Sequence, residues 1–326
     1  MSNPSHFFSC DWGTTTFRLR LVEMDSLRVA AERESTQGAR ELTAGLPAGA
    51  GAIDRARVFE RTLVEHVLAM PMAESVIAAG AQVIVSGMAS SSIGWRELPY
   101  APLPFAVDGS QTRAERLTIV FANRQLPVLL VSGVASDSEM MRGEETQVIG
   151  LLAAADREHV AQNGLMILPG THSKHVRVRQ GAIAGLRTFM TGELYDVLCR
   201  HSVLRFTTDA GADAFDAEAF IEGVRAAKAT GLAGSLFQVR TRGVLRGIAA
   251  TANRSFLGGL LIGAELNEVV ADETFPVLLA AAGPVASSYQ LAAEELGLNR
   301  RLELVGADEL KGAVIAGHRQ LLERWQ

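Results

Sequence analysis

The feature that most constrains the fold is a strand–turn–strand pattern near the N-terminus. Phe7–Cys10 is apolar, residues 11–16 (DWGTTT) are small and polar, and Phe17–Leu21 alternates apolar with charged side chains. Alternation with a period of two predicts a half-buried strand, and Asp, Gly and Thr are common in turns. We therefore expect a β-hairpin here, with Leu27–Glu32 as a third strand.

The same pattern returns in the second half of the chain. Leu165–Leu168 is apolar, residues 170–173 (GTHS) form a turn, and Lys174–Arg179 alternates before a third run at Ala182–Phe189. Two unrelated hairpins can look alike, so the register matters. A shift of 157 residues places Gly13-Thr14 on Gly170-Thr171, and it aligns Leu19 and Leu21 with Val176 and Val178. The shared register favours a structural repeat.

Helices are expected to alternate with further strands. The expected strands are Gln82–Ser86, Pro127–Ser132, Phe275–Ala281 and Leu302–Val305, and the expected helices are Asp54–Met70, Glu144–Ala155, Ala214–Lys228, Tyr289–Leu296 and Asp308–Trp325. Such alternation in two copies predicts an α/β protein with two similar domains. We expect residues 1–138 plus the closing helix 308–326 to form the first domain, and residues 139–307 the second.

Composition excludes several classes of function. The chain has 326 residues, 48% of them hydrophobic, and a net charge of −5, which argues against a nucleic-acid partner. Its two cysteines, Cys10 and Cys199, lack zinc spacing and are expected to be reduced thiols. Neither a signal peptide nor an apolar run of about 18 residues is seen, so we expect a cytoplasmic protein without membrane contact.

Both Gly-Thr turns have the chemistry of a phosphate site. A carboxylate such as Asp11, at the end of a buried strand, suits Mg²⁺, and glycine lets backbone N–H groups approach an anion. Two turns of this kind suit the two ends of a polyphosphate. The candidate phosphate ligands are Gly13, Thr14, Thr15, Thr16 and Arg18 in the first copy and Gly170, Thr171, His172, Ser173 and Lys174 in the second. Leu168 replaces Asp11 in the second copy, so no metal is expected there.

These segments resemble the motifs of the superfamily that contains sugar kinases, Hsp70 and actin. Residues 11–18 resemble its first phosphate motif, 169–174 its second, 281–284 its adenosine motif, and 143–150 and 311–314 its two connecting helices. The resemblance implies two RNase H-like (actin-like ATPase) domains with a nucleotide cleft between them. It also implies ATP and Mg²⁺ as cofactors, with adenosine bound at Ala282, Gly283 and Pro284.

Within that superfamily the chain resembles the 2-dehydro-3-deoxygalactonokinase family. The stretches that carry this resemblance are 10–15, 86–91, 141–147, 168–175 and 189–195. It implies transfer of the ATP γ-phosphoryl group to the 6-hydroxyl of 2-dehydro-3-deoxy-D-galactonate, a small-molecule sugar acid. A kinase for a related sugar or sugar acid, an ATPase, an exopolyphosphatase and a non-catalytic sugar sensor remain as alternatives. The preferred epimer is left open, and a homodimer is expected on base rates alone.

Three carboxylates compete for the role of general base. Glu144 and Glu145 begin the first connecting helix, where the superfamily usually places its base, although acidic residues also favour a helix N-terminus for structural reasons. Asp137 is the competitor. We place Glu144 slightly ahead, but the sequence does not separate the three.

The sugar acid needs hydrogen-bond donors and a cation. The loop after Gln82–Ser86 is small and rich in hydroxyls, as loops at strand ends that bind ligands are; its candidate residues are Gly87, Met88, Ala89, Ser90, Ser91 and Trp95. Trp95 either stacks on the sugar or packs in the core. Arg142 either binds the substrate carboxylate, for which a planar guanidinium is suited, or pairs with Glu144 or Glu145.

Overall fold

The computed structural model describes residues 4–47, 49–208, 215–270 and 275–325. It divides into two compact units. Unit 1 comprises Met1–Ala161, Arg179–Leu186 and Asp308–Gln326, and unit 2 comprises Gln162–Val178 and Arg187–Ala307. The closing helix lies in unit 1, and so does the helix that begins at Glu144. The domain boundary expected near residue 138 stays a prediction.

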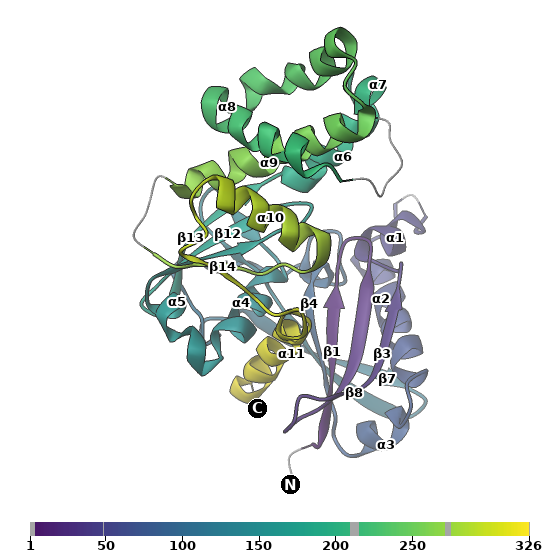
Figure 1. The fold of residues 1–326 in the computed structure, drawn as a ribbon. Coiled ribbons are helices and arrows are strands. Elements are labelled where there is room, and N and C mark those ends of the chain that lie inside the picture. The colour runs from purple at the N-terminus through teal and green to yellow at the C-terminus, as the bar shows by residue number, and fades with distance from the viewer. Residues whose placement is uncertain (1–3, 48, 209–214, 271–274, 326) are drawn as a thin grey trace. The chain divides into compact units, whose positions relative to one another are not determined.

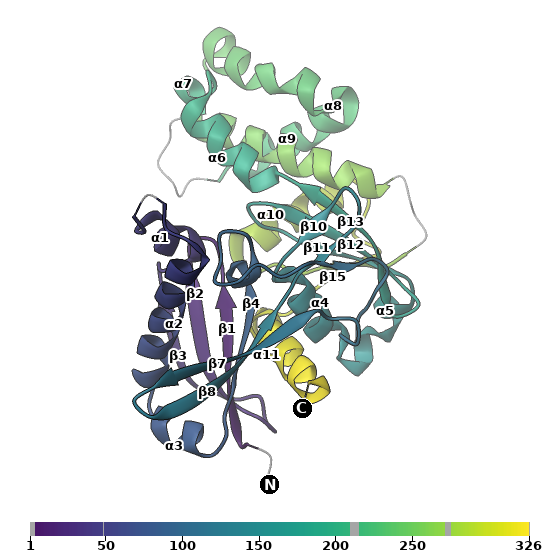
Figure 2. The ribbon, with the colours of Figure 1, turned by 180° about the vertical axis from the view of Figure 1, so that it is seen from behind.

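The sheet of unit 1 has six strands in the order β3-β2-β1-β4-β8-β7. These strands are β1 (His6–Trp12), β2 (Phe17–Glu23), β3 (Val29–Ser35), β4 (Val83–Gly87), β7 (Ala114–Phe121) and β8 (Arg124–Val131). The first three are antiparallel, whereas β1, β4 and β8 run parallel. Helices α2 (Ala52–Leu68) and α3 (Ala73–Ala78) pack their apolar side chains on one face of this sheet (Figures 1 and 2).

The second sheet repeats this topology. Its order is β15-β14-β11-β12-β13-β6, with β11 (Gly164–Leu168), β12 (Ser173–Arg179), β13 (Ala182–Phe189), β14 (Val277–Leu279), β15 (Leu302–Leu304) and the edge strand β6 (Phe105–Ala106). As in unit 1, the first two strands are antiparallel and the first, fourth and fifth are parallel. Strand order 3-2-1-4-5 with this pattern of directions is that of the RNase H-like fold. The predicted α/β fold with two such domains is confirmed.

The two hairpins differ by one residue in the turn. Asp11 pairs with Arg18 in the first hairpin, whereas Leu168 pairs with Lys174 in the second. The expected alignment of Leu19 and Leu21 with Val176 and Val178 is therefore wrong by one residue. Because the turn is one residue shorter, each side chain of β12 lies on the opposite face of the sheet from the one that the expected alignment implies. Lys174 therefore takes the place that Arg18 has in the first copy.

Unit 2 carries a helical layer next to its sheet. Its members are α6 (Thr191–His201), α7 (Arg205–Thr208), α8 (Ala217–Arg246), α9 (Ala250–Val270) and α10 (Gly283–Glu295) (Figure 1). The helix expected at Ala214–Lys228 corresponds to the first part of α8, which is kinked by non-helical backbone at Gly231 (φ 73°), and Ala214 itself lies outside the described residues. Gly259 lets α9 pack closely against α8, since a Cβ there would lie 1.9 Å from the Phe220 carbonyl oxygen.

The remaining elements are short, apart from two helices that cross in unit 1. The short ones are α1 (Ala39–Ala44), η1 (Met88–Ser90), β5 (Ala101–Pro102), β9 (Val134–Ala135), β10 (Met140–Met141), η2 (Ala155–Arg157) and α5 (Glu158–Asn163). The two helices are α4 (Glu144–Leu152) and α11 (Ala307–Arg324). Within the described residues, no helix is both long and apolar enough to cross a membrane.

Glycines allow α4 and α11 to touch backbone to backbone. A Cβ on Gly150 would lie 1.8 Å from the Ala313 carbonyl oxygen, and one on Gly317 would lie 2.1 Å from the Thr146 carbonyl oxygen. Real Cβ atoms do not approach oxygen so closely, so the crossing requires glycine on both helices.

We predict that Gly150→Ala destabilises the protein by about 3 kcal/mol, because the added methyl group forces the two backbones apart. The matched control is Gly312→Ala on α11, where a Cβ meets nothing within 4 Å. There we expect about 0.5–1 kcal/mol of stabilisation from the higher helix propensity of alanine. Urea unfolding of the three proteins measures both changes, and equal stabilities would contradict the packing argument.

Candidate active site

The first Gly-Thr turn is held by the N-terminus of α1. The carbonyl oxygens of Gly13 and Thr14 accept hydrogen bonds from the backbone N–H groups of Ala39 and Arg40, each at 3.0 Å. A Cβ on Gly38 would lie 2.4 Å from the Thr14 carbonyl oxygen. Helix and turn can therefore meet only because residue 38 is glycine, and the turn is fixed from behind by this contact.

The second Gly-Thr turn is held in the same way. The backbone N–H of Glu193, in the first turn of α6, donates to the Thr171 carbonyl oxygen at 3.0 Å. A Cβ on Gly192 would lie 2.6 Å from the Gly170 carbonyl oxygen. The repeat thus extends to a helix N-terminus after the third strand. Sequence analysis missed Gly38 and Gly192, although a glycine shortly after each third strand was a usable signal.

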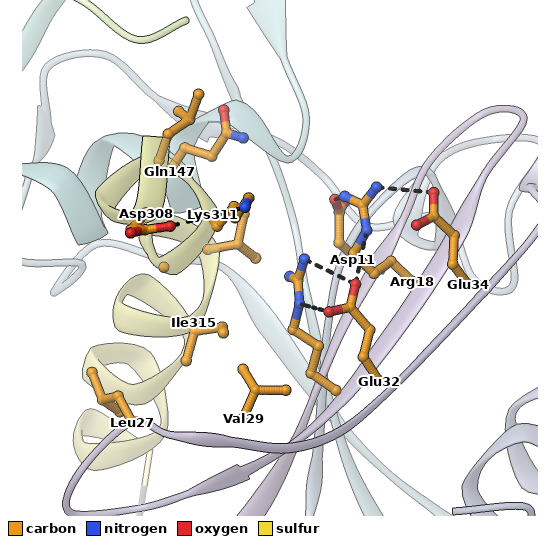
Figure 3. A pocket seen from close by; sticks show the side chains of 14 residues that line it. Asp11, Arg18, Leu27, Val29, Glu32, Glu34, Gln147, Asp308, Lys311 and Ile315 are labelled. Carbon is orange, nitrogen blue, oxygen red and sulfur yellow. Dashed lines mark hydrogen bonds and ion pairs between the residues drawn. The ribbon is translucent and has the colours of Figure 1, made fainter. Parts of the chain in front are cut away.

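Asp11 lines a cavity of about 670 Å³ in unit 1. Figure 3 shows Asp11, Arg18, Glu32 and Glu34 on one side and Gln147, Asp308, Lys311 and Ile315 on the other. The pKa of Asp11 is raised because the carboxyl group is partly buried, although Arg18 and Arg20 oppose the shift. A carboxylate at the wall of a polar cavity suits Mg²⁺ that takes its other ligands from water and phosphate.

Arg18 is engaged by acidic neighbours. Its guanidinium lies 3.0 Å from Glu34 and 3.5 Å from Glu32, whereas the distance to the Asp11 carboxylate is 3.8 Å. These pairs are partly exposed, so each is individually weak. They orient the guanidinium beside Asp11, in the place where a phosphate would need a cation.

Close backbone contacts bring three segments of unit 1 together. Trp12 pairs with Gly87 at the ends of β1 and β4, and a Cβ on Gly87 would lie 2.6 Å from the Trp12 carbonyl oxygen. A Cβ on Gly143 would lie 3.4 Å from the Cα of Gly87. The Asp11 strand, the loop after β4 and the start of α4 therefore meet at one point.

Glu144 and Glu145 both cap their own helix. Glu144 accepts the backbone N–H of Arg142 at 2.9 Å, and Glu145 accepts that of Gly143 at 2.8 Å. Burial, with a smaller contribution from the charge of Glu144, raises the pKa of Glu145 to about 8. Glu145 is thus mainly protonated at neutral pH, whereas Glu144 is only partly buried. Asp137 is exposed at the tip of the β9–β10 hairpin, and Gly143 follows the base of that hairpin.

Arg142 contacts the loop after β4 through its guanidinium. Nη1 donates to both the carbonyl and the hydroxyl oxygen of Ser90 at 2.6 Å, and Nε donates to the Tyr100 hydroxyl at 3.3 Å. The guanidinium also lies 4.1 Å from the centre of the Tyr100 ring. Its side chain is therefore oriented by Ser90 and Tyr100, and its backbone N–H donates to Glu144.

The loop after β4 is firmly packed. Ala89, Ser90 and Ser91 are buried, and Trp95 is 4% exposed within the core of unit 1. This burial favours the packing interpretation of Trp95 over stacking on a sugar. Gly87 has a φ of 89°, which lets the chain turn sharply away from β4 into the loop.

Unit 2 contains a second cavity, of about 660 Å³, that joins two predicted motifs. Gly170 and Thr171 line it together with Pro284 of the expected adenosine segment. The lining also includes Tyr195, Arg254, Gly258 and Tyr289, which the sequence analysis did not assign to the site. Ala282 and Gly283 line a neighbouring cavity of about 620 Å³ that also includes Pro284.

The other predicted ligands of the second turn differ in exposure. His172 is exposed, and its Nε2 lies 2.5 Å from a carboxylate oxygen of Glu193. Ser173 is buried and donates to Glu265 at 2.6 Å. Lys174 is buried as well, and its ammonium donates to the Thr188 hydroxyl at 3.0 Å. Of these three side chains, only that of His172 is open to solvent.

Comparisons with known proteins agree with these features. The family model described as 2-keto-3-deoxy-galactonokinase matches residues 11–316. The chain belongs to this family. It is 35% identical to the Rhizobium meliloti protein named "Probable 2-dehydro-3-deoxygalactonokinase DgoK1", over 97% of this chain and 96% of that protein. It is 31% identical to the 2-dehydro-3-deoxygalactonokinase of Escherichia coli, over 90% of this chain and 91% of that protein.

A solved structure supports the fold of this family member. The crystal structure of a protein from Sinorhizobium meliloti described as a 2-dehydro-3-deoxygalactonokinase is 30% identical to the chain. Its TM-score is 0.77, and the match covers 97% of this chain and 98% of that one.

A buried histidine lies beneath the first turn. His318 of α11 is fully buried, with Nδ1 at 2.8 Å from the Ser9 hydroxyl and Nε2 at 2.9 Å from the Ser86 hydroxyl. Burial, and to a smaller extent the charge of Arg20, lowers its pKa to about 3. The neutral imidazole therefore bridges β1 and β4 close to Asp11 and Gly87. Sequence analysis missed this role, because a lone histidine in a helix has no distinguishing pattern.

We predict that His318 makes the protein less stable as the pH falls below about 6.5. Its folded pKa is depressed, so the unfolded chain binds a proton that the folded chain does not, and the folded state loses about 2 kcal/mol between pH 7 and pH 5. Urea unfolding at both pH values should show this loss in the wild type and a smaller one in His318→Gln. Glu145 titrates with the opposite sign, but it is present in both proteins and cancels. Equal pH dependence in the two proteins would contradict the assignment.

Proposed function

We propose that this chain transfers the γ-phosphoryl group of ATP to the 6-hydroxyl of 2-dehydro-3-deoxy-D-galactonate, giving the 6-phosphate and ADP. The observation that carries the proposal is the pair of matching Gly-Thr turns, one in each unit, within a chain that matches named kinases over 97% and 90% of its length. Phosphoryl transfer requires alignment and charge neutralisation more than covalent chemistry, and fixed turns supply alignment.

Each Gly-Thr turn is proposed to bind phosphate groups. In unit 2, Gly170 and Thr171 offer backbone and hydroxyl donors to a cavity that is also lined by Pro284 of the adenosine segment. Thr14, Thr15 and Thr16 are the proposed donors in unit 1, whereas the backbone N–H of Gly13 donates to the Thr16 carbonyl oxygen at 2.8 Å and so closes the turn. Arg18 supplies positive charge beside Asp11, whereas burial against Thr188 makes Lys174 a weaker candidate for direct contact.

Asp11 is the residue that we propose to hold Mg²⁺. Throughout the described ranges, no three His, Cys, Asp or Glu side chains are grouped so that they alone could hold a metal ion. A single carboxylate that works together with phosphate oxygens fits Mg²⁺, which keeps several waters. Bound there, the ion neutralises charge on the phosphates during transfer.

Glu144 is the proposed general base. In the transfer, the 6-hydroxyl loses its proton to Glu144 while its oxygen bonds to the γ-phosphorus, and the bond from that phosphorus to the bridging oxygen of ADP breaks. Glu144 is the better candidate because it is only partly buried, whereas Glu145 is almost fully buried and mainly protonated at neutral pH. Asp137 lies at the exposed tip of its hairpin and ranks third.

The substrate carboxylate is proposed to bind Arg142, with Gly87, Met88 and Ser91 forming the neighbouring wall. The contacts of Arg142 to Ser90 and Tyr100 use Nη1 and Nε, so the Nη2 edge is the one proposed to meet the carboxylate. We place the reaction in the cytoplasm, where ATP is available. The partner is a small sugar acid, and a homodimer stays a base-rate expectation.

A coupled assay of ADP release tests the proposed function. We predict that 2-dehydro-3-deoxy-D-galactonate stimulates ADP release at least 100-fold over the sugar-free rate, because the base acts only on a bound acceptor. The panel should include the gluconate epimer, hexoses and inorganic polyphosphate. Stimulation by a hexose alone would indicate a kinase for a different sugar. Release of phosphate from polyphosphate without ATP would overturn the proposal.

Replacing the candidate bases one at a time tests their assignment. We predict that Glu144→Gln lowers kcat by about 10²–10⁴-fold with little change in either KM, as loss of a general base does. The matched control is Glu145→Gln, which keeps a neutral side chain like the protonated carboxyl group and should lower kcat less than tenfold. Steady-state kinetics at saturating ATP distinguishes the two, and the reverse order of effects would assign the base to Glu145.

A further inference from the structure

A buried carboxylate in unit 2 joins three structural elements. Glu265 of α9 is 1% exposed and accepts four hydrogen bonds from side chains. The donors are Ser173 at 2.6 Å, His175 at 2.9 Å, Tyr289 at 2.8 Å and Thr191. They come from β12, α6 and α10, so one side chain ties together segments that are far apart in sequence.

Two of these donors fix the second Gly-Thr turn. Ser173 is the first residue of β12 and directly follows the turn at Gly170–His172. Thr191 is the first residue of α6 and directly precedes Gly192, whose backbone packs against Gly170. Glu265 therefore holds both the exit of the turn and the helix that supports it.

The Tyr289 hydrogen bond connects Glu265 to the adenosine segment. Tyr289 lies within α10, which begins at Gly283, and it is six residues from that start. Tyr289 and Pro284 line the same cavity as Gly170 and Thr171. The turn and the adenosine segment, which both line this cavity, are thus connected through a single carboxylate.

Stability alone does not account for this arrangement. A buried carboxylate costs free energy that its partners recover only with good geometry, and replacing such groups by packed apolar residues is often neutral or stabilising. Burial opposes ionisation of Glu265, but hydrogen bonds from His175, Ser173 and Thr191 and the His175 charge outweigh it and lower the pKa. An ionised acceptor requires all its neighbours to point at it, and this fixes their positions.

We propose that Glu265 is a positioning residue that sets the separation between the second Gly-Thr turn and the adenosine segment, so that the phosphates and the adenosine of one nucleotide are bound together. The inference rests on the proposed function, because it assumes that the unit 2 cavity binds ATP. Glu265 contacts no substrate itself. Its effect is expected on nucleotide affinity and not on the acceptor.

The test replaces Glu265 by its neutral isostere. In Glu265→Gln an NH₂ group replaces one acceptor oxygen, so the two groups that donate to that oxygen must reorient to accept or lose their hydrogen bond. We predict that the Kd and the KM for ATP rise about tenfold or more, while the KM for the sugar acid and kcat at saturating ATP change less than threefold. Titration calorimetry with ATP and steady-state kinetics measure these quantities.

A matched control lies one turn further along α9. Glu268 is half-exposed and pairs with Arg187, so Glu268→Gln makes the same chemical change in the same helix and should leave the ATP affinity within twofold. An unchanged Kd for ATP in Glu265→Gln would overturn the proposal. A rise in both KM values together with a fall in kcat would also overturn it, because that pattern indicates general disruption of the fold.

Milder variants keep the proposal testable if Glu265→Gln fails to fold. Tyr289→Phe removes only the hydroxyl that faces α9, and Ser173→Ala removes only the one beside the turn. Each should raise the Kd for ATP several-fold, and the double variant should differ from the product of the two effects because both act through Glu265. Strictly multiplicative effects on the Kd would show that the second Gly-Thr turn and the adenosine segment are not coupled.

Measurements of ATP binding and of phosphoryl transfer by the wild-type protein distinguish failure of the inference from failure of the proposed function. Binding of ATP without transfer to any sugar acid would overturn the proposed function alone, since the Kd values still report on Glu265. Absence of ATP binding by the wild type would overturn both.

Discussion

The contact between a helix N-terminus and a Gly-Thr turn is the constraint on which both units depend. Gly38 and Gly192 bring a helix so close to the turn carbonyl oxygens that no other residue fits. The helix N–H groups satisfy those oxygens, so the turn needs no further partners on that side. In unit 1 the hydroxyl-bearing residues Thr15 and Thr16 stay exposed. A turn fixed from behind and open in front is suited to an anion, because little ordering is left to do when the ligand binds.

The two units support their turns with different buried polar groups. In unit 1 the neutral imidazole of His318 bridges Ser9 and Ser86, whereas in unit 2 the carboxylate of Glu265 collects four donors. The difference follows from the residue at the end of the first strand. Asp11 brings a negative charge to unit 1, and a second buried anion near it would be disfavoured by like-charge repulsion. Leu168 occupies that place in unit 2, so an ionised carboxylate is tolerated there.

Local patterns predicted the strands, both turns and the family, because period-two alternation and Gly-Thr segments are properties of neighbouring residues. Local patterns failed where the structure depends on a residue that is far away in the sequence. The register of β12 depends on a turn that is one residue shorter, which alternation alone does not reveal. Glu265 is a single carboxylate in an apolar helix, and its partners Ser173 and Thr191 are 92 and 74 residues away in the sequence. No periodicity within α9 carries that information.

The site in unit 1 also bears on selectivity. Gly143 abuts Gly87, and the two residues that flank Gly143 are Arg142 and Glu144, proposed for the carboxylate and the reacting hydroxyl. Because these groups are two residues apart on one rigid helix start, their separation is fixed by the backbone. Such an arrangement selects for the distance between an acid group and a terminal hydroxyl, which is a property of chain length. Under the proposed assignment, configuration at an intermediate carbon would be read by the wall of Gly87, Met88 and Ser91, where a missing hydrogen bond would penalise the wrong epimer.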